Sequence, residues 1–180
     1  MKKKFILAAI ICCALTTVFT SCNEEDKTKP EPEDLTPVAA VMNYTLKAGD
    51  EILNSFNVTI EYYDADGQLK TEPMTAKEWT KDVKADLPAT LGARMTIQPK
   101  EGVNFENLEQ FTAAYGYSYR GYAVSANDKV VGQIVSNGID TTLPMKGDKV
   151  SIWQERHADG IVKFLFTFDA EGKADSSSWE

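Results

Sequence analysis

The sequence has few of the residues that form covalent cross-links or act as nucleophiles. Its 180 residues include only three cysteines, Cys12, Cys13 and Cys22. The first two lie in an apolar stretch near the N-terminus, so the chain after Cys22 offers neither a disulfide nor thiol chemistry. The stability of that part must therefore come from a hydrophobic core.

Histidine is equally scarce, which restricts the chemistry that a site could use. The one histidine, His157, lies in the turn-like stretch Gln154 to Gly160, where we interpret it as a solvated loop residue. No HExxH, GxSxG, CxxC or phosphate-loop pattern occurs. Paired carboxylates, which serve glycoside hydrolases, stay open as an alternative because the spacing singles out no pair. We predict that the protein is not an enzyme and holds no cofactor.

Basic residues are outnumbered, and this argues against polyanionic partners. The chain has 19 Lys and Arg against 27 Asp and Glu, for a formal net charge of −8. Removal of a leader that contains Lys2, Lys3 and Lys4, and no acidic residue, takes this charge to −11. Such a chain repels phosphate backbones, so we expect no binding to nucleic acid.

Long apolar runs are absent except at the start of the chain. The stretch from Phe5 to Val18 follows the positive segment Met1 to Lys4. It is shorter than the ~20 apolar residues of a spanning helix. A positive segment followed by a short apolar one is typical of a secretory signal, and we predict a signal peptide over residues 1–21.

The end of this leader resembles a bacterial lipoprotein signal. Phe19-Thr20-Ser21-Cys22 is similar to a lipobox, with Phe19 where the family usually has Leu. The resemblance implies cleavage before Cys22, lipid on its sulfur and an acylated (typically palmitoylated) N-terminus, which together anchor a protein stably in a membrane. The acidic residues that follow resemble the export signal of Bacteroidetes lipoproteins: Glu24, Glu25 and Asp26. This implies an outer-membrane protein exposed at the cell surface; the alternative is an orientation toward the periplasm.

The mature chain divides into a tether, one domain and a tail. Residues 22–37 are acidic and rich in proline, a composition that favours an extended spacer. Residues 38–172 are long enough for one domain with a core of its own. Residues 173–180 are polar, and we expect a flexible tail in which Trp179 is exposed.

Within the domain, apolar and polar residues alternate with a period of two, which is typical of strands with one buried face. Such runs occur over 38–47, 56–63, 68–72, 79–87, 91–98, 111–124, 130–135, 150–154 and 161–168. We expect residues 101–110 to form a loop with a short helical turn. The Asn137-Gly138 turn signal makes residues 136–148 a loop with a short strand at most. About eight short strands predict an all-β, antiparallel, immunoglobulin-like β-sandwich, with a closed up-and-down β-barrel as the alternative.

Several segments of this domain resemble a group of Bacteroidetes lipoproteins. The similar segments are residues 57–67, 78–81, 87–92 and 116–119. The resemblance spans roughly residues 38–172 and implies an immunoglobulin-like sandwich without an assigned activity.

The Asp64-Ala65-Asp66-Gly67 segment resembles the start of a calcium loop. Calcium takes six to eight oxygen ligands, and Asp64 and Asp66 could supply two. No glutamate follows at the spacing of an EF-hand, and hairpin turns use Asp-Gly for backbone reasons alone. The segment therefore predicts either a metal site at Asp64 and Asp66 or a simple hairpin turn.

A second candidate site is the densest aromatic cluster, which comprises Tyr115, Tyr117, Tyr119, Arg120 and Tyr122. Aromatic faces with polar neighbours can bind sugars. Strand periodicity places the first three tyrosines on one face and Arg120 with Tyr122 on the other. One of these faces must be core, where buried tyrosines are common. We expect Trp79 and Trp153 to be core residues as well.

Together these features predict a lipid-anchored, extracytoplasmic binding module whose ligand is a glycan or a protein. The alternative is a structural or assembly component of an envelope or adhesive complex. Exposed planar aromatics would favour the glycan, whereas a bare hydrophobic edge strand would favour assembly.

Overall fold

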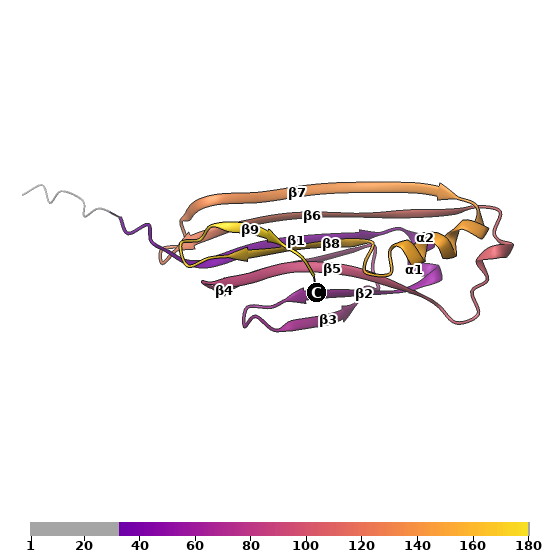
Figure 1. The fold of residues 1–180 in the computed structure, drawn as a ribbon, viewed down its shortest axis with the longest axis horizontal. Helices are drawn as coiled ribbons and strands as arrows, with labels where there is room; N and C mark the ends of the chain where they lie inside the picture. The colour runs from indigo at the N-terminus through magenta and orange to yellow at the C-terminus, as the bar shows by residue number, and fades with distance from the viewer. Residues whose placement is uncertain (1–32, 180) are drawn as a thin grey trace, which may run out of the picture. The chain divides into compact units, whose positions relative to one another are not determined.

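A computed structural model describes residues 33–179. From Asp34 onward the chain forms one compact unit, which is a sandwich of two antiparallel sheets. Figure 1 shows its strands running lengthwise in two layers. The predicted β-sandwich is confirmed, and the closed barrel is not what the structure shows.

The first sheet, sheet A, has the strand order β4-β1-β6-β7, and sheet B has the order β3-β2-β5-β8-β9. Sheet A contains β1 (Pro37–Ala48), β4 (Glu78–Asp86), β6 (Phe111–Ser125) and β7 (Val130–Met145). Sheet B contains β2 (Phe56–Tyr63), β3 (Leu69–Pro73), β5 (Ala89–Pro99), β8 (Val162–Phe168) and β9 (Ala174–Ser177). Short helical segments connect them: α1 (Asp50–Ser55), η1 (Phe105–Asn107), η2 (Gly147–Lys149) and α2 (Val150–Arg156). No helix within residues 33–179 reaches the length and apolarity that crossing a bilayer requires.

The core is built by the inward-facing residues of the alternating runs. Met42, Tyr44 and Leu46 of β1 are almost completely buried, as are Ile60 of β2 and Met95 of β5. Each such side chain stabilises the fold by roughly 1.5–3 kcal/mol relative to an exposed position. The core also includes Trp153, with Trp79 packed against it, so both tryptophans lie where the sequence pattern placed them.

Glu72 connects the two sheets along one side of the sandwich. It lies on β3 of sheet B, and its carboxylate accepts hydrogen bonds from Trp79 Nε1 at 2.9 Å and Lys81 Nζ at 3.0 Å, both on β4 of sheet A. The hydroxyl of Tyr62 donates a third hydrogen bond at 2.6 Å. These three donors lower the pKa of Glu72 to about 2, with the Tyr62 hydrogen bond as the largest contribution.

The prediction of a loop over residues 136–148 is wrong for most of its length. Strand β7 runs without interruption through Asn137-Gly138 to Met145 and pairs with β6 as far as Phe111. The long ladder to β6 overrides the local turn signal. Gly138 suits this position because a Cβ there would lie 3.2 Å from the Cβ of Ser118.

The predicted strand over residues 150–154 is also wrong, because this segment forms helix α2. Val150 and Trp153, three residues apart, are its buried residues. That spacing places them on one face of a helix, and the preceding 3₁₀ turn of η2 starts the helical path.

The C-terminal residues differ from the expected flexible tail. Ala174–Ser177 forms β9, which pairs with β8. Beyond it, Trp179 is partly buried rather than exposed. Its ring stacks on Tyr63 with 5.5 Å between centroids, and the Arg94 guanidinium lies 4.8 Å from the ring centroid. Its indole N–H donates to the carbonyl of Phe164 at 3.3 Å.

Candidate functional site

Three of the candidate tyrosines lie on the inner face of β6. Tyr115, Tyr117 and Tyr119 are partly buried and pack against the core. Tyr117 and Tyr119 stack with 6.0 Å between centroids, and Tyr119 contacts Phe164 of sheet B at 4.6 Å. Burial is the main cause that raises the pKa of Tyr119 above its ordinary value. Tyr117 and Tyr119 thus join the two sheets, and Tyr115 packs against Trp153 of α2, so the three rings form no outward platform.

The other two members of the cluster lie on the outer face of sheet A. The Arg120 guanidinium lies 5.5 Å from the centroid of the Tyr122 ring. Arg120 is exposed and Tyr122 is half-buried. The structure thus divides the predicted cluster between two faces and does not bring its five residues together.

The Asp64 carboxylate holds the β2–β3 turn. Its Oδ1 accepts the backbone N–H groups of Asp66 at 3.0 Å and Gln68 at 2.8 Å, and Lys70 lies 3.1 Å from Oδ2. The Gln68 hydrogen bond is the largest cause of a lowered pKa at Asp64. Within residues 33–179, no group of three or more His, Cys, Asp or Glu side chains could hold a metal ion.

His157 follows α2 and engages the end of that helix. Its Nδ1 lies 2.7 Å from the carbonyl oxygen of Trp153, and its ring lies 5.4 Å from the Trp153 ring. The imidazole therefore belongs to the local packing of α2.

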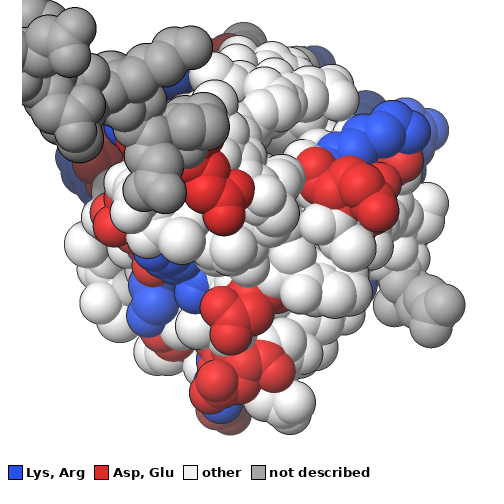
Figure 2. All heavy atoms as spheres, turned by 90° about the vertical axis from the view of Figure 1, so that its left-hand side faces the viewer, with Lys and Arg blue, Asp and Glu red and all other residues white. Residues whose placement is uncertain are grey.

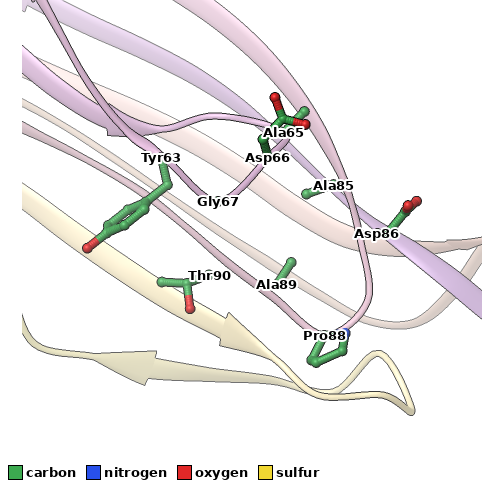
Figure 3. A pocket seen from close by; sticks show the side chains of 9 residues that line it. All are labelled: Tyr63, Ala65, Asp66, Gly67, Ala85, Asp86, Pro88, Ala89 and Thr90. Atoms are coloured by element: carbon green, nitrogen blue, oxygen red, sulfur yellow. The ribbon is translucent and has the colours of Figure 1, made fainter.

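A hollow of about 580 Å³ lies beside the β2–β3 turn, against the β4–β5 connection. Figure 3 shows the Tyr63 ring and the Thr90 hydroxyl on one side of it and the carboxylates of Asp66 and Asp86 on the other. The space-filling view of this end of the domain shows carboxylates interspersed with smaller basic areas (Figure 2). A ligand here would meet the carboxylates of Asp66 and Asp86 and the side of the Tyr63 ring that Trp179 does not cover.

The most unusual surface is the outer edge of β7, because it carries almost no charge. β7 is an edge strand of sheet A and has one charged residue, Asp140, among its 16 residues. The opposite edge of the same sheet, β4, has five charged residues among nine: Glu78, Lys81, Asp82, Lys84 and Asp86. Charged side chains on an edge prevent pairing with foreign strands, so β4 is protected in a way that β7 is not.

The single charge on β7 is exposed on the outer face of sheet A and leans back over its own sheet. The Asp140 carboxylate lies 3.4 Å from Lys47 Nζ on β1, two strands away. It reaches across Gly116 of β6, and a Cβ at that glycine would overlap the carboxylate. The ion pair therefore leaves the free edge of β7 without an outward charge.

Exposed apolar side chains accompany this edge. Ile134, Ile139 and Leu143 are 46%, 49% and 42% exposed. Ile139 and Leu143 pair in register with Tyr117 and Ala113, so both lie on the inner face. Ile134 pairs with Tyr122 and lies on the outer face, so the exposed apolar residues of the inner face are Ile139 and Leu143.

An apolar hollow of about 570 Å³ adjoins the C-terminal part of β7. Leu143 and Met145 line it together with Ile152 and Trp153 of α2, and its rim is formed by Lys149, Arg156 and His157. We call the free edge of β7, with Ile139, Leu143 and this hollow, the β7 edge site.

Sequence reasoning missed this site because the Asn-Gly pair was read as a turn. The segment also lacks the period-two signal of a strand, because Val135, Ile139 and Leu143 recur every four residues and share their face with polar Asn137 and Thr141. The proposed lipidation residue Cys22 and the acidic residues Glu24, Glu25 and Asp26 lie outside the described residues.

Comparisons with protein-family models, with curated proteins and with solved structures find no match to this chain.

Proposed function

We propose that this protein is a lipid-anchored, extracytoplasmic docking module that binds a protein strand along the β7 edge site. Binding of an extended segment to a free sheet edge supplies main-chain hydrogen bonds, and alternate side chains enter pockets beside it. The observation that carries the proposal is the contrast between β4, with five charged residues, and β7, with one.

The proposal extends the prediction that a bare hydrophobic edge would favour assembly. We assign no catalytic step to the protein. Anchoring through lipid on Cys22, in the outer membrane and facing the cell exterior, is part of the proposal and is supported by the sequence resemblance alone. A tethered domain with one adhesive edge is suited to joining a neighbouring envelope protein.

The test is photochemical cross-linking in cells that express the full chain. The photoreactive residue p-benzoylphenylalanine is placed at Ile139 of β7 or, as the matched control, at Thr80 of β4. We expect adducts to form from position 139 and not from position 80. Equal labelling from both edges, or no adduct from position 139, would overturn the proposal.

A glycan is the second candidate ligand, favoured by the hollow beside Tyr63. An aromatic face with hydroxyl and carboxylate groups opposite it is a common arrangement in sugar sites. A glycan array probed with the full chain in detergent should show binding that Tyr63→Ala removes and Tyr122→Ala, on the outer face of sheet A, leaves intact. No binding to any plant or host glycan on the array would rule out a glycan as the ligand.

A further inference from the structure

We propose that the strand bound by β7 is the β7 strand of a second copy, paired antiparallel about a two-fold axis at Ile139. This inference rests on the proposed docking function and names its partner. The pair would join two four-stranded sheets into one continuous eight-stranded sheet.

The free part of the edge is bounded on both sides. Near its start, β7 has a register shift relative to β6 between Tyr122 and Ala123, and Gly132 has a φ of 74°. A bulge of this kind bends the strand and interrupts pairing. Near its end, Pro144 has no N–H to donate. The Gly138 N–H already donates to Asn137 Oδ1 at 2.8 Å, and the rest of the intervening segment, Ile134 to Leu143, is left free to pair.

The inner face of this segment reads the same in both directions. Val135, Ile139 and Leu143 are apolar and equally spaced, with polar Asn137 and Thr141 between them. An axis at Ile139 places Ile139 opposite its own copy, Val135 opposite Leu143, and Asn137 opposite Thr141. Every apolar residue then meets an apolar residue, which is the arrangement that stabilises cross-strand pairs.

The outer face accepts the same register. Asp140 of each copy lies opposite Gly138 of the other, where no side chain obstructs it, and Ser136 lies opposite Thr142. Moving the axis to Asp140 would put two carboxylates directly opposite each other and pair Asn137 with Leu143. Moving it to Gly138 would pair Ile139 with Asn137. Of the axes at Gly138, Ile139 and Asp140, the one at Ile139 matches polarity on both faces.

The charge distribution of the molecule also favours contact at the β7 edge. Two copies without the leader, with a formal charge of −11 each, repel over most of their surfaces. The neutral β7 edge is where they can approach, since its one carboxylate is paired with Lys47. A second copy always present at the same membrane thus fits the edge in both polarity and charge.

Cysteine cross-linking of the full chain in cells tests the register. Ile139→Cys should form an interchain disulfide under mild oxidation, because directly opposed residues lie within the range that a disulfide spans. Asn137→Cys should not link to itself but should link to Thr141→Cys when the two chains are co-expressed. The wild-type chain measures any cross-link through Cys22. The Thr80→Cys variant measures links that form by random collision.

Self-linking of Asn137→Cys at the rate of Ile139→Cys, or no link from Ile139→Cys, would overturn the inference. The photochemical adducts distinguish failure of self-pairing from failure of the docking function. Adducts from position 139 that contain a different protein keep docking and reject self-pairing. The absence of any adduct rejects both.

Sedimentation of the purified full chain in detergent gives an independent measurement. Ile139→Lys places two like charges opposite each other and should raise the dimer dissociation constant by about 100-fold or more. Thr80→Lys should leave the dissociation constant unchanged. Unfolding midpoints equal to wild type show that both variants fold, and a wild-type chain that sediments as a monomer would reject the dimer.

Discussion

Glu72 shows how one side chain can close a sandwich along its edge. It accepts hydrogen bonds from its own sheet through Tyr62 and from the facing sheet through Trp79 and Lys81. The Lys81 ammonium also lies 4.7 Å from the centroid of the Tyr62 ring. Removing the carboxylate leaves three donors without their acceptor.

We predict that Glu72→Gln lowers the free energy of unfolding by about 1–2 kcal/mol at pH 7, since hydrogen bonds to a charged group are lost at a partly exposed site. The folded-state pKa of about 2 lies below the ordinary value of 4.5. The stabilisation is therefore present above pH 4.5 and is lost as the pH falls toward 2.

Urea unfolding at a series of pH values measures this effect. The difference in the free energy of unfolding between wild type and Glu72→Gln should be constant above pH 4.5 and should disappear near pH 2, the folded-state pKa of Glu72. Glu109→Gln, at an exposed carboxylate without a structural contact, is the control. A difference that does not vary with pH would contradict the prediction.

Tyr44 and Tyr62 give a matched pair at the same scale. The Tyr44 hydroxyl is buried, and no hydrogen bond of normal geometry reaches it. Burial raises the pKa of Tyr44, and the nearby backbone of Gly92 acts in the opposite direction. Tyr44→Phe should raise the free energy of unfolding by about 1 kcal/mol, because it removes an unpaired buried polar group.

Tyr62→Phe should lower that free energy by about 1–3 kcal/mol, because its hydroxyl donates to Glu72. Thermal unfolding of the two variants should therefore show midpoints on opposite sides of wild type. A lower unfolding midpoint for both variants would mean that the Tyr44 hydroxyl has a hydrogen-bond partner.

At the scale of elements, β9 is an edge strand of sheet B, and Trp179, just after it, folds over the outer face of this sheet. The Trp179 ring contacts Tyr63 of β2 and Arg94 of β5, and its indole N–H donates to the carbonyl of Phe164 in β8. Three strands are thus connected by the last residues of the chain.

Trp179→Ala should lower the free energy of unfolding by about 1–2 kcal/mol, from the loss of the ring stack and the cation–π contact. Urea unfolding monitored by circular dichroism measures the change, because it does not depend on the fluorescence of the replaced residue. Ser178→Ala, next to it and exposed, is the control. Equal stability of the two variants would show that the contact is not maintained in solution.

Most strands were predictable from the sequence, and the exceptions have physical causes. β1, β2 and β4 alternate between more and less buried residues along most of their length, and β5 does so from Ala93 to Ile97, so a period of two locates them. The apolar residues Val162, Phe164, Phe166 and Phe168 locate β8, although Leu165 between them is buried as well. β7 carries Gly138 and Pro144 and buries no residue fully, so its existence depends on the ladder to β6. A propensity for turns cannot reveal such a partner.

The candidate site was predictable only in part for the same reason. The tyrosines of β6 were correctly divided between two faces, because side chains alternate along any strand. The β7 edge site depends on which strand ends a sheet and where α2 lies, and both follow from long-range pairing. Helix α2 itself was missed because Val150, Ile152 and Gln154 alternate as a strand would, whereas burial selects Val150 and Trp153.

At the scale of the whole molecule, the proposed lipid anchor on Cys22 would set how the domain is presented. A fully extended chain from Cys22 to Pro37, at about 3.3 Å per residue, would span roughly 50 Å. A two-fold axis parallel to the membrane normal would place the starts of both β1 strands at the same height. Two anchored copies can then pair on one membrane.

The acidic residues after Cys22 give a prediction at this scale. Replacing Glu24, Glu25 and Asp26 by Ala should leave the protein membrane-bound but protect it from protease added to intact cells. Replacing Glu31, Glu33 and Asp34 removes equal charge farther from the lipid and should leave the protein accessible. Accessibility of both variants would contradict the role of the first three acids in export.

The charged edge of β4 determines how far such an association can extend. Once two β7 strands have paired, the joined sheet ends on both sides in a β4 strand with five charged residues. Contacts of this symmetric kind use up the surface that forms them. The protein should therefore stop at a closed pair on the membrane and remain unable to polymerise into filaments.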